Sequence, residues 1–147
     1  KATGSHCMPP RPDRSMGPAA TRYHQRPGEV EGPAAMRRFA ACDATVFLVA
    51  ESGGQVRGLI RAVYDGSRAL IHLLSVDPDV QRQGVGRALL AATEAELGRC
   101  GAPGAAVPVT KASAGFWGQQ GYGSLPVRLM LKPRFASRSD GEGLGSE

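Results

Sequence analysis

The sequence has few of the residues that build metal centres or disulfide scaffolds. Its 147 residues contain three cysteines, Cys7, Cys42 and Cys100, and no two of them form a CxxC pair. A disulfide framework or a cysteine-rich zinc site is therefore not expected, and this usage fits a reducing, cytoplasmic compartment. The three histidines are also scattered, so no metal site is predicted.

Long apolar runs and targeting segments are missing as well. No stretch approaches the roughly 20 apolar residues that cross a bilayer. No basic region is followed by a short apolar core and a small-residue cleavage site, which would mark a secretory signal. We therefore expect neither a membrane partner nor export.

Basic residues are in excess but are not concentrated. The net charge is +5, with +3 in residues 1–43, +3 in residues 44–133 and −1 in residues 134–147, and no four basic residues are consecutive. A nucleic-acid-binding protein would depend on this charge alone and would bind with steep salt dependence. The even distribution argues against nucleic acid as a partner and suits a ligand that carries phosphates.

The chain divides by composition into three parts. Residues 1–33 hold six of the eleven prolines and few periodic apolar residues, so we expect a disordered leader. Gly4-Ser5-His6 within it resembles a cloning scar. Residues 34–133 are expected to form one domain, and residues 134–147 a flexible tail.

Within the domain, apolar spacing and turn residues predict alternating helices and strands. Leu89, Leu90, Thr93 and Leu97 give one helix an inward stripe. The pattern predicts an α/β fold with a mixed central sheet. The expected helices are 34–41, 85–99 and 112–120, and the expected strands are 45–50, 55–64, 69–76, 104–109 and 124–131.

One segment carries a pattern typical of phosphate binding. The most apolar strand ends at Val76, and the loop that follows it contains Gly84 and Gly86 and begins a helix. The first amides of a helix have no internal partner, so this loop is suited to a phosphate, with Arg82 and Arg87 beside it. The sequence has no Gly-Lys-Ser or Gly-Lys-Thr of a P-loop, and Leu89 stands where a dinucleotide fingerprint needs its third glycine.

Two ordered motifs resemble signatures of a known family. Gln81-Arg82-Gln83-Gly84-Val85-Gly86 resembles the (Q/R)-x-x-G-x-(G/A) acetyl-CoA signature of the GNAT superfamily of N-acetyltransferases, and Leu74-Ser75-Val76-Asp77-Pro78 is similar to the strand end before it. Phe116-Trp117-Gly118-Gln119-Gln120-Gly121-Tyr122 resembles the second signature, F-Y-x-x-x-G-(F/Y). The resemblance covers residues 44–133 and is strongest to small bacterial acetyltransferases of the YpeA type.

The resemblance implies a GNAT fold in which acetyl-CoA (coenzyme A) is the co-substrate. It would lie where strands 69–76 and 104–109 splay apart, with the Val76 backbone on the pantetheine arm and residues 81–87 around the pyrophosphate. The implied activity is transfer of an acetyl group to a primary amine, on a small molecule or a peptide, by direct attack in a ternary complex. The residues expected to bind the cofactor are Leu74, Val76, Gln81, Arg82, Gln83, Gly84, Val85, Gly86, Arg87, Phe116 and Trp117.

The sequence departs from the family at the catalytic positions. Trp117 stands where the family has its tyrosine general acid, and indole has no proton to give at useful pH. Tyr122 is the alternative acid in the same motif. Many members carry a glutamate base on the central strand, at the position of Leu70 or of His72. Leu70 cannot act as a base, whereas the imidazole of His72 has a suitable pKa. The alternative reading of His72 is a half-buried residue satisfied by hydrogen bonds.

Two further features bear on the function. Only one helix is expected before residue 45, where the family has a strand and two helices, so the acceptor side is either open or completed by a second copy of the chain in a homodimer. The arginines near the hairpin, Arg57, Arg61 and Arg68, are expected in solvent, with a contact to a CoA phosphate or an acidic acceptor as the alternative. A non-catalytic acyl-CoA-binding sensor, or degenerate GNAT domain, remains the rival to the enzyme.

Overall fold

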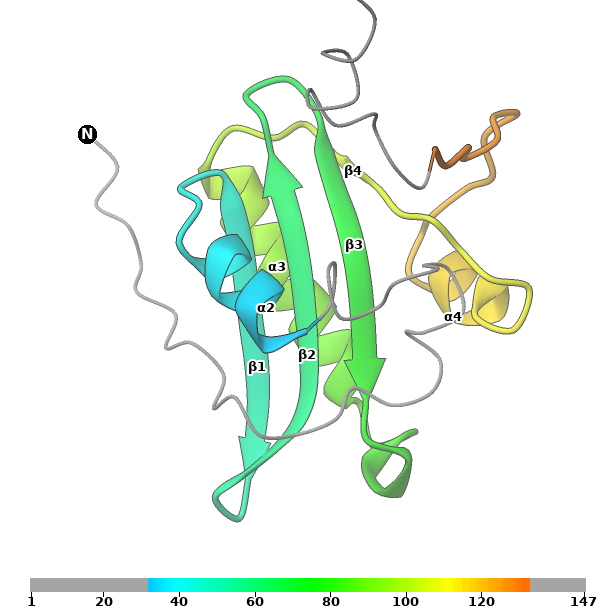
Figure 1. The fold of residues 1–147 in the computed structure, drawn as a ribbon. Helices are drawn as coiled ribbons and strands as arrows, with labels where there is room; N and C mark the ends of the chain where they lie inside the picture. Colours follow the sequence, from blue (N-terminus) through cyan, green and yellow to red (C-terminus); the bar gives the residue numbers. More distant parts are fainter. Residues whose placement is uncertain (1–31, 133–147) are drawn as a thin grey trace, which may run out of the picture.

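A computed structural model describes residues 32–132, so the expected tail and nearly all of the expected leader lie outside the described residues. The core of the fold is a sheet of order β1-β2-β3-β4, with helices on both faces (Figure 1). The first three strands are antiparallel and β4 is parallel to β3, which confirms a mixed sheet. The elements are α2 (Pro33–Ala40), β1 (Thr45–Ser52), β2 (Gln55–Tyr64), β3 (Ala69–Val76), a 3₁₀ helix (Pro78–Val80), α3 (Val85–Arg99), β4 (Ala105–Ala106) and α4 (Ala114–Gln119).

The hairpin between β1 and β2 is tight because its two linking glycines adopt left-handed backbone conformations. Gly53 has φ 59° and Gly54 has φ 72°, as a two-residue primed turn requires. The β2–β3 turn is closed by Asp65, whose Oδ1 accepts from the amides of Ser67 and Arg68, each at 2.7 Å. These local signals explain why β2 and β3 begin and end at the predicted residues.

The main core lies between the sheet and α3. The predicted stripe of that helix, Leu89, Leu90, Thr93 and Leu97, is buried as expected. A smaller cluster on the other face of the sheet joins α2 to Phe47 of β1. Helix α3 approaches the sheet closely at Gly58, where an added Cβ would lie 3.0 Å from Leu89 Cδ1 and 3.1 Å from the Ser75 carbonyl oxygen.

The C-terminal half of the domain differs from the prediction. The strand expected over 104–109 is reduced to Ala105–Ala106, which pairs only with Ala69 and Leu70 before the chain leaves the sheet. The strand expected over 124–131 is wrong, because these residues form no regular structure. Alternation predicts a strand only where a neighbouring strand supplies hydrogen bonds, and this segment has no such neighbour among residues 32–132.

Candidate cofactor site

The second half of β3 has an open edge. Its partner β4 pairs only with the first two residues of β3, so residues 71–76 have strand β2 on one side and no described strand on the other. Backbone N–H and C=O groups at an open edge can bind an extended amide chain in place of a strand. The divergence expected from the sequence is therefore present and begins after Leu70, although residues 107–109 form no strand.

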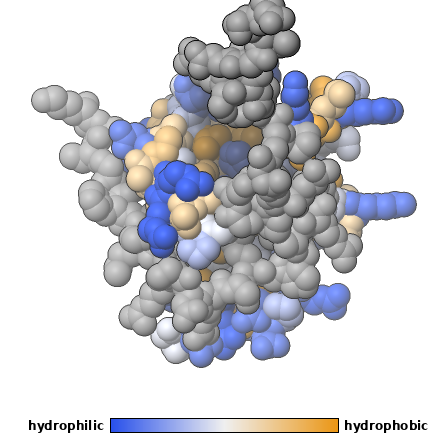
Figure 2. Space-filling model, viewed as in Figure 1, coloured by the Kyte–Doolittle hydropathy of each residue, from blue (hydrophilic) through white to orange (hydrophobic). Residues whose placement is uncertain are grey.

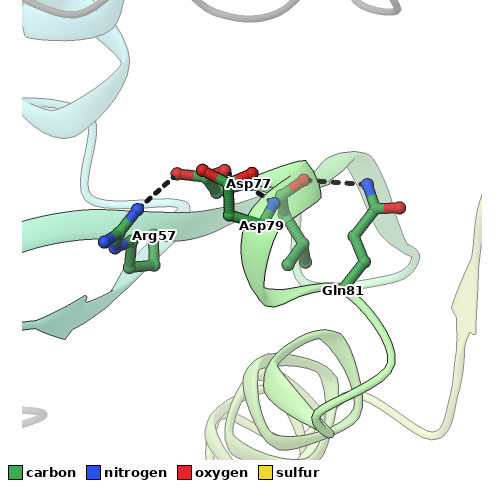
Figure 3. Close-up of polar contacts among 5 residues, drawn as sticks. Arg57, Asp77, Asp79 and Gln81 are labelled. Carbon is green, nitrogen blue, oxygen red and sulfur yellow. Dashed lines mark hydrogen bonds and ion pairs between the residues drawn. The ribbon is translucent and has the colours of Figure 1, made fainter.

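The loop that leaves β3 is held by a chain of polar contacts (Figure 3). Arg57 Nη1 donates to Asp77 Oδ2 at 2.9 Å, and the Asp77 amide donates to the Arg57 carbonyl oxygen at 2.7 Å. The other carboxylate oxygen of Asp77 accepts from the Asp79 amide at 3.0 Å. These hydrogen bonds from Asp79 and Arg57 hold the pKa of Asp77 below its usual value.

The Gln81 side chain takes part in this scaffold. Its Nε2 donates to the Val76 carbonyl oxygen at 3.1 Å, so the side chain ties the loop to the end of β3. Sequence reasoning placed Gln81 around a pyrophosphate. The structure gives it a second role, which is to set the direction in which the loop leaves the strand.

Two residues in left-handed conformation shape the loop before α3. Arg82 has φ 64° and Gly84, the N-cap residue, has φ 84° and no side chain with which to cap the helix. The helix's first bond runs from the Ala88 amide to the Gly84 carbonyl oxygen at 2.9 Å. The amides of residues 85–87 consequently have no acceptor within the helix, which makes its positive end available to an anion.

The first turn of α3 meets the end of β3 and α4 at Gly86. A Cβ on Gly86 would lie 3.4 Å from Val76 Cγ2, 3.7 Å from Leu74 Cδ2 and 3.7 Å from Phe116 Cζ. Four residues predicted separately as cofactor contacts are thus brought together at one place. Without a side chain at Gly86, the first turn of α3 can lie close to the end of β3.

The aromatic residues of the second signature mostly serve packing. Trp117 is 6% exposed and contacts the rings of Phe116 and Tyr122 edge-on, with centroids 5.2 and 5.1 Å away. The Tyr122 hydroxyl donates to Glu94 Oε1 of α3 at 2.8 Å. Burial and the neighbouring Glu94 carboxylate raise the pKa of Tyr122 well above its ordinary value. The motif thereby fastens the end of α4 to α3.

His72 lies at an irregularity of β3. In the pairing with β2, Leu73 is opposite Arg61 and Ile71 is opposite Ala62, so His72 is the extra residue of a β-bulge. Its side chain is partly exposed, and the ring lies edge-on to Phe39 of α2, with centroids 6.0 Å apart. No hydrogen bond to the imidazole is found within residues 32–132, so the alternative of a histidine satisfied by such bonds has no support from them.

Arg61 lies next to this histidine and is not in solvent, as the sequence led us to expect. It is 5% exposed, its guanidinium lies 5.5 Å from the centroid of the Phe39 ring, and Nη1 lies 3.7 Å from Met36 Sδ. Partial burial and the Arg61 charge lower the pKa of His72 below 6.5. At neutral pH the imidazole is therefore uncharged and able to accept a proton.

Sequence reasoning missed three residues that shape the site: Asp77, Glu94 and Phe39. Asp77 before Pro78 gave a turn signal, and its interaction with Arg57 could not be read because the two are 20 positions apart in sequence. Nothing in the sequence pointed to Glu94 or Phe39 as partners of Tyr122 and His72.

Among the described residues no helix is long and apolar enough to span a membrane. No group of three or more metal-binding side chains is found in that same part of the chain.

Comparison with known proteins agrees with this geometry. Residues 20–127 match the model of the acetyltransferase (GNAT) domain family. The acetyltransferase SG1711 of Sodalis glossinidius (strain morsitans) is 41% identical over 61 residues, a match that covers 42% of this chain and 43% of that protein. The match therefore spans less than half the length of the curated relative.

Solved structures share the fold. An aminoglycoside acetyltransferase, meta-AAC0020, from an uncultured soil metagenomic sample superimposes with a TM-score of 0.59 at 20% identity, covering 67% of this chain and 72% of that one. The aminoglycoside N-acetyltransferase AAC(6')-Iy, solved in complex with CoA, gives 0.57 at 16% identity, covering 70% and 85%. The chain belongs to the GNAT acetyltransferase family.

Proposed function

We propose that this protein is an acetyl-CoA-dependent N-acetyltransferase that moves the acetyl group to a primary amine by direct attack in a ternary complex. The observation that carries the proposal is the open edge of β3, which leads directly into the uncapped first turn of α3. A ligand with an extended amide arm and a pyrophosphate matches both halves of this surface. The family match and the CoA complex of a structural neighbour support the same reading.

On the donor side, each group of residues has a distinct task. Acetyl-CoA supplies a thioester, an acyl group already activated for transfer. The backbone of Val76, at the open edge of β3, would hold the arm, with Leu74 and Phe116 beside it at Gly86. The amides of residues 85–87 and the cations of Arg82 and Arg87 would bind the phosphates.

On the acceptor side, we assign the general base to His72. An amine attacks the carbonyl carbon only in its neutral form, so its ammonium proton must be removed first. The lowered pKa of His72 keeps the imidazole neutral at pH 7 and able to take this proton, directly or through water. As the C–N bond forms and the C–S bond breaks, the electron pair of the C–S bond leaves with the thiolate, and the attacking nitrogen loses its second proton to water to give the amide.

The leaving thiolate needs a proton to become the free thiol of CoA. Trp117 is buried among aromatic rings and cannot act as an acid. The role of Tyr122 stays a prediction, since its hydroxyl would have to leave Glu94 to serve the thiolate. A thiol has an ordinary pKa near 8.5, so releasing it as thiolate at pH 7 costs only about 2 kcal/mol, and water can complete the step.

The acceptor and the setting are also proposals. Structural neighbours named as aminoglycoside acetyltransferases favour a small-molecule amine, and a peptide amine is the second choice. A cytoplasmic location fits the free thiols of Cys42 and Cys100, and a bacterial source fits the relative from Sodalis glossinidius. A second copy of the chain is the proposed macromolecular partner.

The buried position of Trp117 favours one rival, a non-catalytic domain that senses acyl-CoA. Calorimetric titration with acetyl-CoA, followed by a CoA-release assay over a panel of amines that includes aminoglycosides and peptides, separates the two. Binding with turnover supports the enzyme. Binding without turnover on any amine supports the sensor, and absence of binding refutes both.

A pair of variants ties the result to the site. Gly86→Glu forces a charged side chain among Val76, Leu74 and Phe116 and should abolish acetyl-CoA binding. Gly98→Glu makes the same change near the far end of α3, where an added Cβ meets nothing within 4 Å, and should bind normally. Equal affinity of the two variants for acetyl-CoA would show that acetyl-CoA does not bind at this surface.

A further inference from the structure

The backbone at the end of β3 has a definite direction. The Asp77 amide donates to the Arg57 carbonyl oxygen at 2.7 Å, so the polar backbone groups of Asp77 point toward β2. Successive residues of a strand turn their N–H and C=O groups to opposite sides. Those of Val76 therefore point away from β2, to the side where no described strand pairs with residues 71–76. An extended amide ligand at this edge would use the Val76 carbonyl oxygen as an acceptor.

The structure gives this carbonyl oxygen a partner that resembles such a ligand. Gln81 Nε2 donates to the Val76 carbonyl oxygen at 3.1 Å (Figure 3). The side chain of glutamine ends in a carboxamide, whose N–H donors are of the same kind as those of a backbone or pantetheine amide. The Gln81 side chain therefore lies on the acceptor that the arm of acetyl-CoA would need.

The backbone of Gln81 is held by contacts other than this bond. Its amide donates to the Pro78 carbonyl oxygen at 3.4 Å, and Arg82 after it turns the chain with a φ of 64°. The ion pair of Arg57 and Asp77 fixes the start of the same loop. The carboxamide can therefore turn away from the strand by rotation about the bonds of its own side chain.

The surroundings of the bond make its release inexpensive. Gln81 is exposed, and the loop that contains it is polar. In Figure 2, hydrophilic side chains gather at the lower end of the molecule, where Figure 1 shows the loop after β3. A released carboxamide would be solvated there, so breaking the bond costs only the net contribution of one neutral hydrogen bond. This corresponds to a change of about twofold to tenfold in an equilibrium constant.

We propose that the Gln81 carboxamide holds the place of the ligand's arm on Val76 and is displaced from it when acetyl-CoA binds. The proposal rests on the proposed function, because it needs acetyl-CoA at the open edge of β3. One amide donor is exchanged for another, so the Val76 carbonyl oxygen keeps one hydrogen bond throughout. A ligand that has the phosphates and no arm offers no such donor and would leave Gln81 in place. Gln81 thus opposes binding of the arm and not of the phosphates.

Calorimetric titration of the full chain with two ligands tests the exchange. The first is CoA, and the second is its nucleotide half, which has the pyrophosphate and no pantetheine arm. Gln81→Met keeps the length of the side chain and removes its donor. We expect this variant to bind CoA about twofold to tenfold more tightly than the wild type and the nucleotide half with unchanged affinity. In denaturation without ligand, the unfolding equilibrium constant of the variant should rise by the same factor, because the same bond is lost.

A matched control and the contrary results complete the design. Gln55→Met makes the same change at the exposed start of β2 and should leave the CoA affinity unchanged. Weaker binding of both ligands by Gln81→Met would make this residue a phosphate contact and would overturn the exchange. Unchanged CoA binding by that variant would mean that the carboxamide and the arm share the Val76 oxygen, which overturns it too. Either result leaves the proposed function intact, whereas a wild type that binds no CoA would refute both.

Discussion

Gly84, the residue before α3, offers a direct measure of how much the phosphate loop depends on its backbone conformation. Its φ of 84° and ψ of 7° are left-handed, and an added Cβ would meet no atom within 4 Å. Gly84→Ala therefore introduces backbone strain and no clash. The left-handed conformation costs an L-residue about 1–2 kcal/mol, and reduced freedom of the unfolded chain offsets about 0.4–1 kcal/mol of this. A net cost of about 1 kcal/mol remains.

This cost can lower the free energy of unfolding, the binding free energy for acetyl-CoA, or both. The sum of the two losses is fixed. If the loop keeps its shape without ligand, the free energy of unfolding falls by about 1 kcal/mol and the affinity for acetyl-CoA is unchanged. If the free loop relaxes, stability is kept and the affinity falls about fivefold, which is the same free energy. Chemical denaturation of the free protein and calorimetric titration with acetyl-CoA give the two numbers, and their sum should be about 1 kcal/mol.

Two controls separate this effect from others. Asn tolerates the left-handed region, so Gly84→Asn should recover most of the loss. Gly98→Ala, in open space near the end of α3, should stabilise the helix by about 0.5–1 kcal/mol without changing the affinity. If Gly84→Ala changes neither quantity, or if Asn is as harmful as Ala, the argument from the loop conformation is refuted.

Three further predictions follow from the packing and the titratable groups. Gly58→Ala should destabilise the fold by about 1–3 kcal/mol in denaturation, since its Cβ would lie 3.1 Å from a backbone oxygen of β3; a stabilised variant would contradict the close approach of α3. Tyr122→Phe should lower stability by about 0.5–1.5 kcal/mol by removing the bond to Glu94, with turnover reduced less than tenfold; a loss of 10²–10⁴ would make this residue the general acid. The lowered pKa of His72 means that the unfolded chain binds its proton more tightly, so the free energy of unfolding should fall as the pH drops below 6.5 toward the folded pKa. Turnover should decline as the pH falls through the folded pKa, where the imidazole becomes protonated. His72→Gln should remove both dependences, and an imidazole that titrates at or above 6.5 in an NMR pH titration would contradict the lowered pKa.

The elements that the sequence predicted well are those defined by local signals. β2, β3 and α3 have the predicted bounds because Asp65-Gly66 and Asp77-Pro78 interrupt the apolar pattern and the two-residue and 3.6-residue periods are clear between them. The phosphate loop was predictable for the same reason, since its glycines and the helix start are contiguous in sequence. Only Arg82, a non-glycine residue in left-handed conformation, had no signal.

The features that could not be predicted depend on contacts between distant residues. Arg61 is charged and occupies an alternating strand, which favours solvent, but α2 covers that face of the sheet and buries the guanidinium beside Phe39. Residues 124–131 show the converse, because their alternation is strand-like and no described strand pairs with them. The apolar alternation shows that a segment is able to form a strand. The strand forms only where a neighbouring strand is present to pair with it.

The open edge of β3 and the proposed base share one structural origin, the point on β3 where the sheet changes. Pairing with β4 ends at Leu70, and the bulge that contains His72 follows within two residues. Because β4 leaves there, the rest of β3 has no strand on that side among residues 32–132, and this edge can take an extended ligand. Because the bulge lies at the same level, it brings the proposed base to the beginning of the open edge. A longer β4 would close the cofactor cleft and, by extending the paired part of the sheet, would move that beginning away from His72.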